Sequence, residues 1–326
     1  MGVAFPNITD VVATTIQNRS KKLGDNVTRN NAFTAYLKKH GHVKTFEGGD
    51  VILQEFNFQE NGNFNWYSGY DFLNVQAQDV ITAAQYPIRQ AACAVLISGL
   101  EQLQNSGRER MIDLLSGRIE VAEATMGNRM AEGAYSDGTG YGGKQLQGLA
   151  SLIPDDPTTG TAGGVDRSLW PFWRSQVSST GSAFSAMTAA NLQAAMNGIW
   201  AKCVRGTDRP KFIISDTQGW LSYMASLQAL QRFTGSESAE LGFQTVKFMD
   251  ADFILDGGIG GFAPANRMYF VNPKYVWMRP HKDRNMVPLN PNKRIPLNQD
   301  AEVQLIAFAG NMTSNGLQFQ GLLRGA

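Results

Sequence analysis

Apolar residues recur at spacings of three and four along the middle of the chain, and this period predicts a helix from about Arg108 to Ala134. Ser106 is placed to cap its start, and Gly133 lies near its end. The preceding stretch, residues 84–107, is also predicted to be helical. The apolar positions of the long helix are Met111, Leu114, Leu115, Ile119, Ala122, Met126 and Met130.

Alternating apolar and polar residues predict two strands, at 50–59 and 64–76. The sequence Glu60–Asn63 between them is typical of a hairpin turn. An isolated hairpin is marginal in water, so its aromatic side chains must be buried in their own domain or on a neighbouring subunit. These side chains are Phe56, Phe58, Phe64, Trp66, Tyr67, Tyr70 and Phe72.

Residues 1–45 are polar, with scattered apolar positions. Residues 9–23 could form an amphipathic helix, and residues 30–41 a second one that stops at Gly41. Because nothing here would fill a core of its own, we expect an extended arm that packs on another element. The basic residues of this arm are Arg19, Lys21, Lys22, Arg29, Lys38, Lys39 and Lys44.

The second half of the chain has an α/β pattern. Residues 146–154 are expected to be a strand, and a loop-rich stretch containing 155–168 follows. The predicted helices are 188–204 and 216–233, the latter capped by Asp216. The predicted strands are 210–215, 245–255, 267–272 and 275–280. A polar, proline-rich loop at 281–298 leads to a final hairpin over 302–326, with its turn at Asn315–Gly316.

Charge is scarce in this sequence. Charged residues make up 17% of the 326 positions, against about 25% in a typical domain. Lysine and arginine number 29 and aspartate and glutamate 28, so no net field attracts nucleic acid or an anionic membrane. Such a surface suits a protein covered by neighbours, and also an ordinary neutral protein. Basic residues within Arg205–Lys211 are interpreted as solvated surface.

The cysteines and the hydropathy pattern indicate the cellular compartment in which the protein is expected. The two cysteines, Cys93 and Cys203, are predicted to be buried thiols of a reducing compartment. No apolar run approaches the 18–20 residues that a membrane span needs, and no leader segment opens the chain, so a soluble protein made in a cytoplasm is expected.

A near-match to a phosphate-binding loop runs from Gly138 to Lys144. Such a loop needs Ser or Thr after the lysine and must connect a strand to a helix. Here Gln145 follows, and the predicted order of helix and strand is inverted, so a nucleotide site is not expected. The pattern Gly258–Ala263 follows a strand, but Pro264 and another strand come next, which favours a glycine turn over a dinucleotide site.

Candidate catalytic and metal-binding residues are few. The three histidines are His40, His42 and His281, and no second cluster completes a metal site with the first two. Asp250 and Asp252 would share one strand face, which is weak evidence for acid–base chemistry. We therefore predict no enzyme activity, no catalytic residues, no cofactor and no metal.

The order of elements resembles the major capsid protein of tailed bacteriophages, an α+β protein of the Hong Kong 97-type fold. The glycine-rich break after the long helix carries this resemblance most specifically, as Asp137-Gly138-Thr139-Gly140 followed by Gln147-Gly148-Leu149. Residues 301–323 are similar to the closing strands of the family's peripheral domain, and the resemblance covers essentially the whole chain. A further match to the family's axial domain is Pro210, Ile213, Ile214, Trp220 and Leu221.

The resemblance implies a domain division. It comprises an N-terminal arm (1–45), an extended hairpin loop (46–80), a peripheral domain with the spine helix (81–150), an axial domain (151–285) and a return to the peripheral domain (286–326). It also implies contact of the hairpin aromatics with a neighbouring subunit, while the arm crosses to another. A hinge is expected at Gly138, Gly140, Gly142 and Gly143.

The implied function is self-assembly into hexamers and pentamers of an icosahedral head around double-stranded DNA. The protein would then reside in the virion, after assembly in the host bacterial cytoplasm. Its partners would be its own copies, a separate scaffolding protein or none, a portal and decoration proteins, with no membrane. Lys44 is the only lysine near the hairpin and lies at its base, so cross-linking chemistry is not expected.

Two other functions stay open. One is an encapsulin-like compartment of the same fold, which encloses protein cargo. The other is a soluble α/β enzyme that uses the glycine loops. Removal of Val51–Asn74 is predicted to leave a folded subunit that no longer forms shells.

Overall fold

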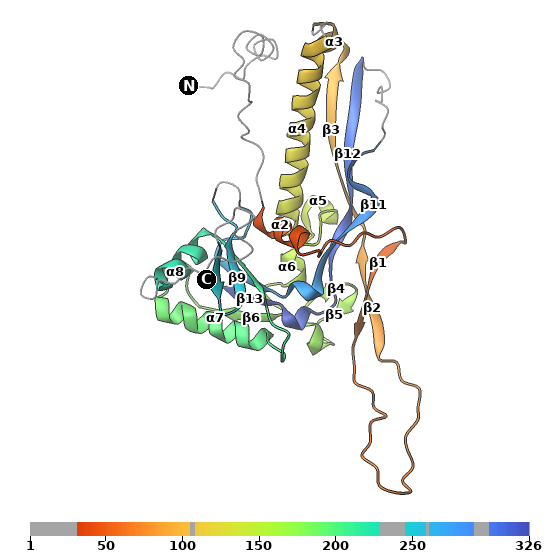
Figure 1. Ribbon diagram of the computed structural model, residues 1–326, viewed down its shortest axis with the longest axis vertical. Helices are drawn as coiled ribbons and strands as arrows, with labels where there is room; N and C mark the ends of the chain where they lie inside the picture. The colour runs from red at the N-terminus through yellow and green to blue at the C-terminus, as the bar shows by residue number, and fades with distance from the viewer. Residues whose placement is uncertain (1–30, 105–107, 228–244, 259–260, 290–299, 326) are drawn as a thin grey trace.

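The computed structural model describes residues 31–104, 108–227, 245–258, 261–289 and 300–325. The chain forms a compact α/β part from which two extensions project in opposite directions (Figure 1). One extension is a long helix lying along strands, and the other is a strand pair that continues into an open loop.

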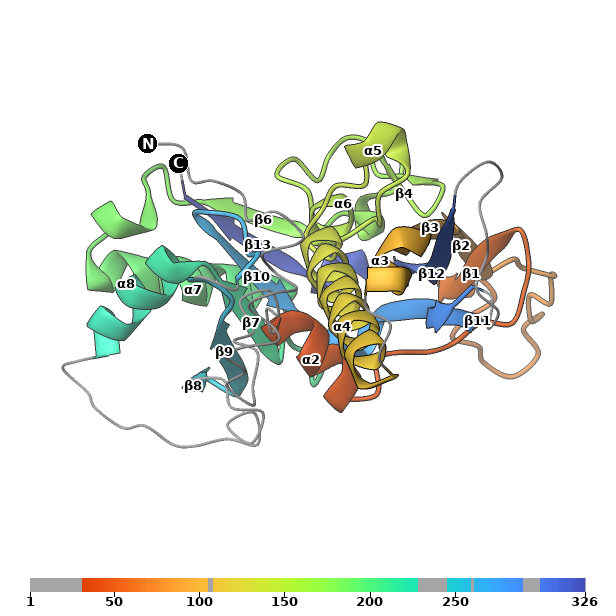
Figure 2. The ribbon, with the colours of Figure 1, turned by 90° about the horizontal axis from the view of Figure 1, so that it is seen from above.

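The compact part is built on a six-stranded sheet (Figure 2). The strands β7 and β9 are parallel, as are β13 and β6, and the remaining pairs are antiparallel. In spatial order the strands are β6 (Gln176–Ser179), β13 (Gly321–Arg324), β10 (Arg267–Val271), β7 (Phe212–Ser215), β9 (Ala251–Leu255) and β8 (Thr245–Phe248).

Two helices, α7 (Ala189–Cys203) and α8 (Thr217–Leu227), pack against this sheet (Figure 2). The Thr188 hydroxyl accepts from the Asn191 amide at 3.4 Å, and the Asp216 carboxylate accepts from the Gly219 amide at 3.0 Å. The starts of both helices and the strands β7, β8, β9 and β10 were predicted correctly, because short apolar runs are strong local signals. Strand β6 was not predicted, and β13 was expected in a hairpin. The part of the second helix predicted beyond residue 227 lies outside the described residues.

The upper extension is a three-stranded sheet with a helix along it. The order is β11 (Val276–Pro288), β12 (Ala301–Ser314) and β3 (Arg89–Ser98), joined through α3 (Gly99–Gln104) to the spine helix α4 (Arg108–Gly133). Arg118 of α4 donates to both carboxylate oxygens of Glu101, at 2.9 and 2.7 Å, and to the carbonyl of Leu96 at 2.8 Å. These bonds fasten the helix to β3 near its tip. The predicted helix is confirmed, while Ser106 lies outside the described residues.

The helix predicted at 84–107 is wrong for residues 84–98 and correct only for α3, and residues 105–107 lie outside the described residues. This stretch contains the end of β2 (Ile81–Pro87), all of β3 and α3. Along β3, buried Val95 and Ile97 alternate with exposed Leu96, and Val95 joins Ile306 of β12 and Ala122 of α4 in a small core cluster. The alanine-rich sequence forms a strand because Arg89–Ser98 pair with residues Gly310 to Ala301 of β12. This backbone pairing outweighs the local preference of the sequence for a helix.

The chain's C-terminal segment also differs from prediction. Instead of closing a hairpin with β12, β13 leaves the three-stranded sheet and inserts between β6 and β10 of the other sheet. Residues 281–288, predicted as loop, extend β11. Residues 149–152, predicted within a strand, form the single turn α6 (Leu149–Leu152). The remaining short elements are α5 (Gly140–Gly143), β4 (Thr161–Ala162), β5 (Val165–Asp166), η1 (Pro171–Trp173), η2 (Phe184–Ala186), η4 (Pro273–Tyr275) and η5 (Leu317–Phe319).

The described part of the predicted arm belongs to the core of its own subunit. Helix α2 (Ala32–Lys39) buries Phe33, and Tyr36 stacks on Phe212 of β7 with ring centroids 3.8 Å apart. After the helix, the Phe46 amide bonds to the Pro280 carbonyl at 3.1 Å, so this segment runs beside β11. The expectation that residues 31–45 cross to a neighbouring subunit is therefore wrong, because Phe33, Tyr36 and Leu37 on one face of the helix anchor it in the core of its own chain. Residues 1–30 lie outside the described residues.

Sheet membership does not follow the predicted domain boundaries. The chain enters the three-stranded sheet at Val276, ahead of the boundary at 286, and returns to the six-stranded sheet at Gly321. The division into arm, loop, peripheral and axial domains stays a prediction. In the described residues, no helix is both long enough and apolar enough to span a bilayer.

Gly117 tests the intrinsic stability of the spine helix. A Cβ atom at this position would meet no atom within 4 Å. Alanine is favoured over glycine in a helix interior by about 0.8–1 kcal/mol. Gly117→Ala is therefore expected to raise the free energy of unfolding by up to about 1 kcal/mol, measured by urea denaturation of the unassembled subunit. A loss of stability would show that α4 needs this glycine for close packing.

Candidate assembly surfaces

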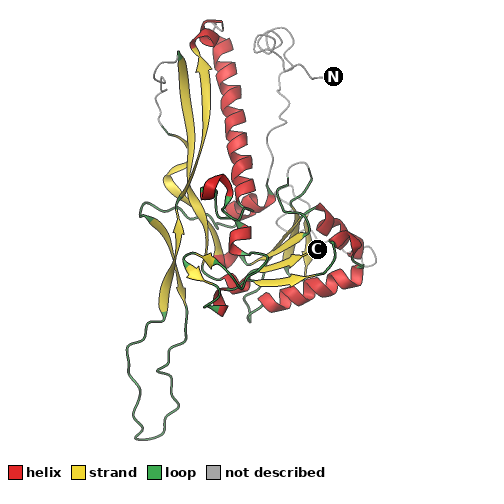
Figure 3. Ribbon diagram, turned by 180° about the vertical axis from the view of Figure 1, so that it is seen from behind, coloured by secondary structure: helices red, strands yellow, loops and turns green. Residues whose placement is uncertain are grey.

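The lower extension is the strand pair β1 (Val51–Asn57) and β2 with the loop 58–80 between them (Figure 3). The antiparallel register runs from Val51 opposite Pro87 to Asn57 opposite Ile81. The second strand predicted at 64–76 is therefore wrong, and the turn expected at Glu60–Asn63 is not the tip of the hairpin. The hydrophobic alternation of 64–76 has no strand partner within the described chain.

Side-chain amides hold the two arms of the loop together. Gln59 Nε2 donates to the Asp79 carbonyl at 2.5 Å, and Asn63 Nδ2 donates to the Gln76 carbonyl at 2.5 Å. Between them the Gly62 amide donates to Gln78 Oε1 at 3.0 Å. These bonds take the place of a backbone ladder, and sequence reasoning missed them although the loop is rich in asparagine and glutamine.

The aromatic side chains beyond this amide ladder point into solvent. Trp66 is 91% exposed, Tyr70 103% and Phe72 102%. Phe64 and Trp66 meet edge to face at 5.5 Å but both stay exposed. Exposure of so many large apolar groups in one segment marks an interaction site. The other exposed apolar residues of the segment are Tyr67, Leu73 and Val75.

Two of the predicted contact residues have a different environment. Phe56 is buried and stacks on Trp173 with centroids 4.4 Å apart. Phe58 meets Trp170 edge to face at 6.1 Å. Both residues anchor the base of the loop to their own subunit. The exposed set available to a neighbour is thus Phe64, Trp66, Tyr67, Tyr70 and Phe72.

The glycine-rich stretch after α4 forms a loop whose ends are tied together. The Gly148 amide bonds to the Ser136 carbonyl at 3.0 Å, and the Leu149 amide bonds to the Ala134 carbonyl at 2.7 Å. The Ser136 hydroxyl also donates to the Leu146 carbonyl. Residues 137–147 therefore leave the body of the subunit and return to the same place, as in an Ω-loop.

This closed geometry argues against a hinge at Gly138, Gly140, Gly142 and Gly143. Gly138, Gly142 and Gly143 have positive φ angles of 83°, 68° and 79°, as does Tyr141 at 55°. Because the loop ends are bonded to each other, rotation at these residues would move the loop tip and leave α4 fixed relative to α6. Gly138, Gly142 and Gly143 supply the left-handed backbone that the tight turns of this loop require.

A buried asparagine holds the second half of the motif. Asn311 of β12 accepts from the Gln147 amide at 3.0 Å and donates both to Gln147 Oε1 at 2.9 Å and to the Pro87 carbonyl at 2.9 Å. It joins the loop, the β2–β3 corner and the central strand. At Gly148 a Cβ would overlap the carbonyl groups of Gly133 and Ala134. The Gln-Gly-Leu sequence is therefore a packing requirement at the end of the spine helix.

A second buried polar junction ties together three separate elements. Asn31 Nδ2 donates to Asp256 Oδ2 at 2.7 Å, and the Tyr135 hydroxyl donates to the same oxygen. Asn31 caps α2, Tyr135 follows α4, and Asp256 follows β9. Burial raises the pKa of the Asp256 carboxyl above its usual value, against the opposing effect of these hydrogen bonds. Burial, followed by the charge of Asp256, raises the pKa of Tyr135. Nothing in the local sequence signals this junction.

The nucleotide-like motifs have no binding geometry. Tyr141 and Gly142 in α5 have left-handed dihedral angles, so the loop does not lead into a regular helix with a phosphate-binding N-terminus. After the turn at Gly258 the next regular element is strand β10, as predicted. The first motif is therefore a turn, and residues 259–260 of the second lie outside the described residues.

The remaining candidate residues also have structural surroundings. His40 lies against the Tyr36 ring at 4.1 Å, and His281 meets Phe46 edge to face at 5.0 Å. Among the described residues, no group of three potential metal ligands comes together. Cys203 is buried, which raises its pKa to about 12, whereas Cys93 is only half-buried, contrary to prediction.

The sequence matches no family model, and no curated protein matches it. Its structure is nevertheless similar to solved structures over nearly its whole length. The chain in the Cyanophage A-1(L) capsid asymmetric unit matches with a TM-score of 0.67 and 15% identity, covering 94% of this chain and 95% of the other. A chain in the capsid of the native GTA particle gives 0.61 and 13%, with 95% of each chain covered. The holo-SrpI encapsulin complex from Synechococcus elongatus gives 0.54 and 11%, covering 97% and 94%.

These similarities define the fold of the chain. It is the fold of phage capsid subunits, and an encapsulin shares it. The predicted α+β Hong Kong 97-type capsid fold is therefore confirmed, and with it the resemblance inferred from the glycine motif and the order of elements.

Substitution of Gly148 tests the packing role of the motif. Gly148→Ala is expected to lower the free energy of unfolding by about 1–3 kcal/mol, because the added methyl group must displace backbone. Urea denaturation of the subunit measures this change. The matched control is Gly117→Ala, which adds the same methyl group in open space. Equal stability of Gly148→Ala and the wild type would contradict the role assigned to this residue.

The junction at Asp256 predicts a pH dependence. Because folding raises the pKa of Asp256 above 3.8, ionisation is less favourable in the folded subunit than in the unfolded chain. The wild type should therefore lose stability relative to Asp256→Asn as the pH rises from about 4 through the raised pKa. Above the raised pKa, the difference in unfolding free energy between the two proteins should stay constant. Urea midpoints of both proteins across this pH range measure it, and a difference that instead widens toward acid would refute the assignment.

Proposed function

We propose that this chain is a structural, non-catalytic major capsid protein that assembles into the shell of a bacteriophage head. The observation that carries the proposal is the loop 58–80, whose aromatic side chains are exposed beyond an amide-braced base. A free subunit gains nothing from this exposure, whereas a neighbouring copy can cover it. The fold shared with phage capsid subunits supports the proposal.

The energetics favour assembly through this loop. Complete burial of one large apolar side chain contributes about 1.5–3 kcal/mol. Trp66, Tyr70 and Phe72 are almost wholly exposed, so each can contribute close to this amount on contact with a neighbour. The amide ladder reduces the entropy lost on docking, because it restrains the loop before contact. A shell repeats this contact at every subunit.

The finer features of the proposal follow from the capsid role. Hexamers and pentamers of this chain would form an icosahedral virion head around double-stranded DNA, assembled in the host bacterial cytoplasm with a scaffolding protein, a portal and decoration proteins. The near-equal numbers of basic and acidic residues fit an inner surface that tolerates DNA without binding it specifically.

An encapsulin-like compartment is the second candidate, favoured by the structural similarity to the encapsulin complex. The nature of the enclosed cargo separates the two functions. Shells purified from the native source should contain nuclease-protected double-stranded DNA if the chain is a capsid protein. A single co-purified protein species without nucleic acid would establish the compartment instead.

The exposed aromatics give a direct test of assembly. The triple variant Trp66→Ser/Tyr70→Ser/Phe72→Ser should keep the wild-type unfolding free energy within about 0.5 kcal/mol, because these side chains touch little in the subunit. The concentration needed for shell formation should rise more than tenfold for each ring lost. Sedimentation and negative-stain microscopy measure this change.

Glu60→Ser is the matched control, since it alters an exposed loop position without removing an apolar group. Unchanged shell formation by the triple variant would show that the loop is not an assembly contact. The predicted deletion of Val51–Asn74 is unsuitable as a test, because β1 contributes buried Ile52 and Phe56 to the core. A deletion must stay between the ends of β1 and β2.

A further inference from the structure

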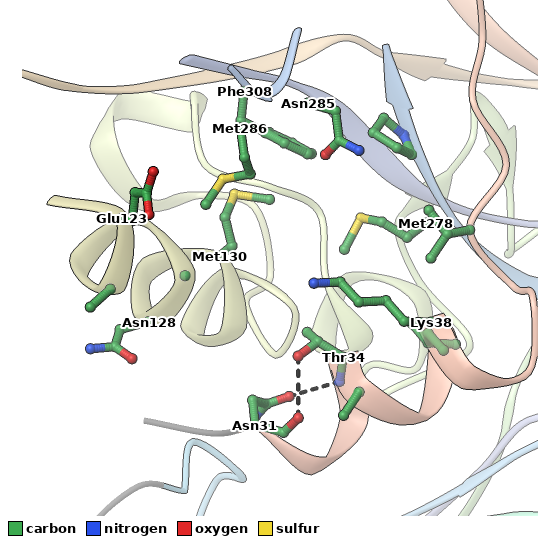
Figure 4. A pocket seen from close by; sticks show the side chains of 16 residues that line it. Asn31, Thr34, Lys38, Glu123, Asn128, Met130, Met278, Asn285, Met286 and Phe308 are labelled. Carbon is green, nitrogen blue, oxygen red and sulfur yellow. Dashed lines mark hydrogen bonds between the residues drawn. The ribbon is translucent and has the colours of Figure 1, made fainter. Parts of the chain in front are cut away.

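A groove opens between α2, α4 and β11 (Figure 4). Its volume is about 520 Å³, and Met130 of α4, Met286 of β11 and Lys38 of α2 line it. Exposed Glu123 lies on its rim, about one turn along α4 from exposed Glu120. Both signs of charge are present, and nothing among the described residues favours one kind of occupant for this groove.

A second pocket lies between α4, β3 and the glycine-rich loop 137–147, and its volume is about 390 Å³. The side chains on one face of β3 account for the space, since every second residue of a strand points to the same side. Val95 fills the gap between the sheet and Ala122 of α4. Nearer the start of the strand, Ala91 and Cys93 on the same face are smaller and line the pocket. The helix and the strand are therefore in contact at one end and leave a cavity at the other.

The floor of this pocket is apolar. Met126 of α4, Leu146 of the glycine-rich loop and Phe308 of β12 line it and are buried in the core of the subunit. Half-buried Met130 and Ala91 pack against the same core. Removing an apolar chain from water onto these side chains is favourable. Volumes of about 300–1,000 Å³ are typical of small-molecule sites, so the cavity suits a compact ligand with an apolar part.

Basic side chains also line the pocket. They are Arg89 of β3, Arg129 of α4 and Lys144 of the glycine-rich loop, whereas Glu132 is the only carboxylate among the described lining residues. Arg129 Nη1 donates to Glu132 Oε2 at 2.6 Å, so these two charges compensate each other. Arg89 and Lys144 form no ion pair with any described residue. The pocket thus carries an excess of positive charge, although the chain as a whole is nearly neutral.

Arg89 also has an unsatisfied hydrogen-bond donor. Its Nε–H is buried and has no acceptor among the described residues. A buried donor without a partner costs stability, so such groups are rare unless a ligand or water pairs with them. A negatively charged oxygen is the acceptor that a guanidinium binds most strongly. Both the charge excess and the unpaired donor therefore favour an anionic ligand over a neutral one.

We propose that this pocket binds a small amphipathic carboxylate. Its apolar chain covers Met126, Leu146 and Phe308, and its carboxylate pairs with Arg89 and Lys144. Such a ligand connects α4, β3 and the glycine-rich loop, and it stabilises the folded subunit because it binds only where these elements meet. The site lies within one subunit, so the proposal does not depend on assembly into shells, and it can fail while the proposed function stands.

Calorimetric titration of the unassembled full-length subunit with octanoate tests the proposal. Octanoate should bind at a single site, and its neutral analogue octanamide should bind at least about tenfold more weakly, because it lacks the charge that pairs with Arg89 and Lys144. Affinity should rise about fourfold for each methylene group from hexanoate to octanoate, since each added group is buried against the apolar floor. Absence of saturable octanoate binding, or equal affinity for octanamide, would overturn the proposal.

Substitutions in the lining test whether octanoate binds in this pocket. Lys144→Gln should weaken octanoate binding at least about tenfold, whereas Lys202→Gln, which removes an exposed lysine from α7, should leave it unchanged. Arg89→Met should weaken binding likewise and keep the wild-type urea midpoint, because the lost Nε–H has no partner among the described residues. Unchanged octanoate affinity in both Lys144→Gln and Arg89→Met would locate the binding elsewhere and contradict the proposal.

A second copy of the chain is the alternative occupant. Its loop 58–80 is rich in aromatic residues and contains Glu60, Asp71 and Asp79 but no basic residue. Titration of the subunit with a peptide of residues 58–80 separates the two occupants. Saturable binding of this peptide without binding of octanoate would assign the pocket to the neighbouring subunit and refute the small-molecule site.

Discussion

The elongated half of the subunit depends on the backbone hydrogen bonds of β12. This strand pairs along its length with β3 on one side and with β11 on the other. Strand β3 in turn supports α4 through the Val95–Ala122 contact and the bonds of Arg118. Without β12 the alanine-rich sequence of β3 would have no strand partner, and the spine helix would have no surface to lie on. After β12 the chain continues into β13, so the same segment joins the two sheets.

Two buried polar side chains determine how the remaining parts meet this framework. Asn311 joins the glycine loop and the β2–β3 corner to β12, and Asp256 joins α2 and the end of α4 to the six-stranded sheet. Each satisfies donors or acceptors from segments distant in sequence. A buried polar group without such partners costs stability, so these contacts fix one relative placement of the elements.

Two surfaces of this rigid body are exposed to solvent. The loop 58–80 exposes aromatic rings that its own chain does not cover, and the groove beside α4 exposes methionines next to acidic residues. Their locations suit different roles. The loop projects away from the body on a braced base, while the groove lies between α2, α4 and β11.

The sequence alone determined the features that depend on local pattern. The period of apolar residues identified α4, the capping residue Asp216 identified the start of α8, and the glycine motif indicated the capsid fold. The exposed aromatic segment was also visible, because no short hairpin can bury so many rings.

Tertiary structure alone decided the rest. Strand β3 replaced a predicted helix, β13 left its predicted hairpin, and α2 was drawn into the core because each found partners far away in the chain. The glycine loop closed on itself through bonds from Ser136 and Gly148 that no local pattern indicates. Long-range backbone pairing and burial outweigh local propensity of about 1 kcal/mol per residue, and a sequence reveals a contact only when both partners are near each other along it.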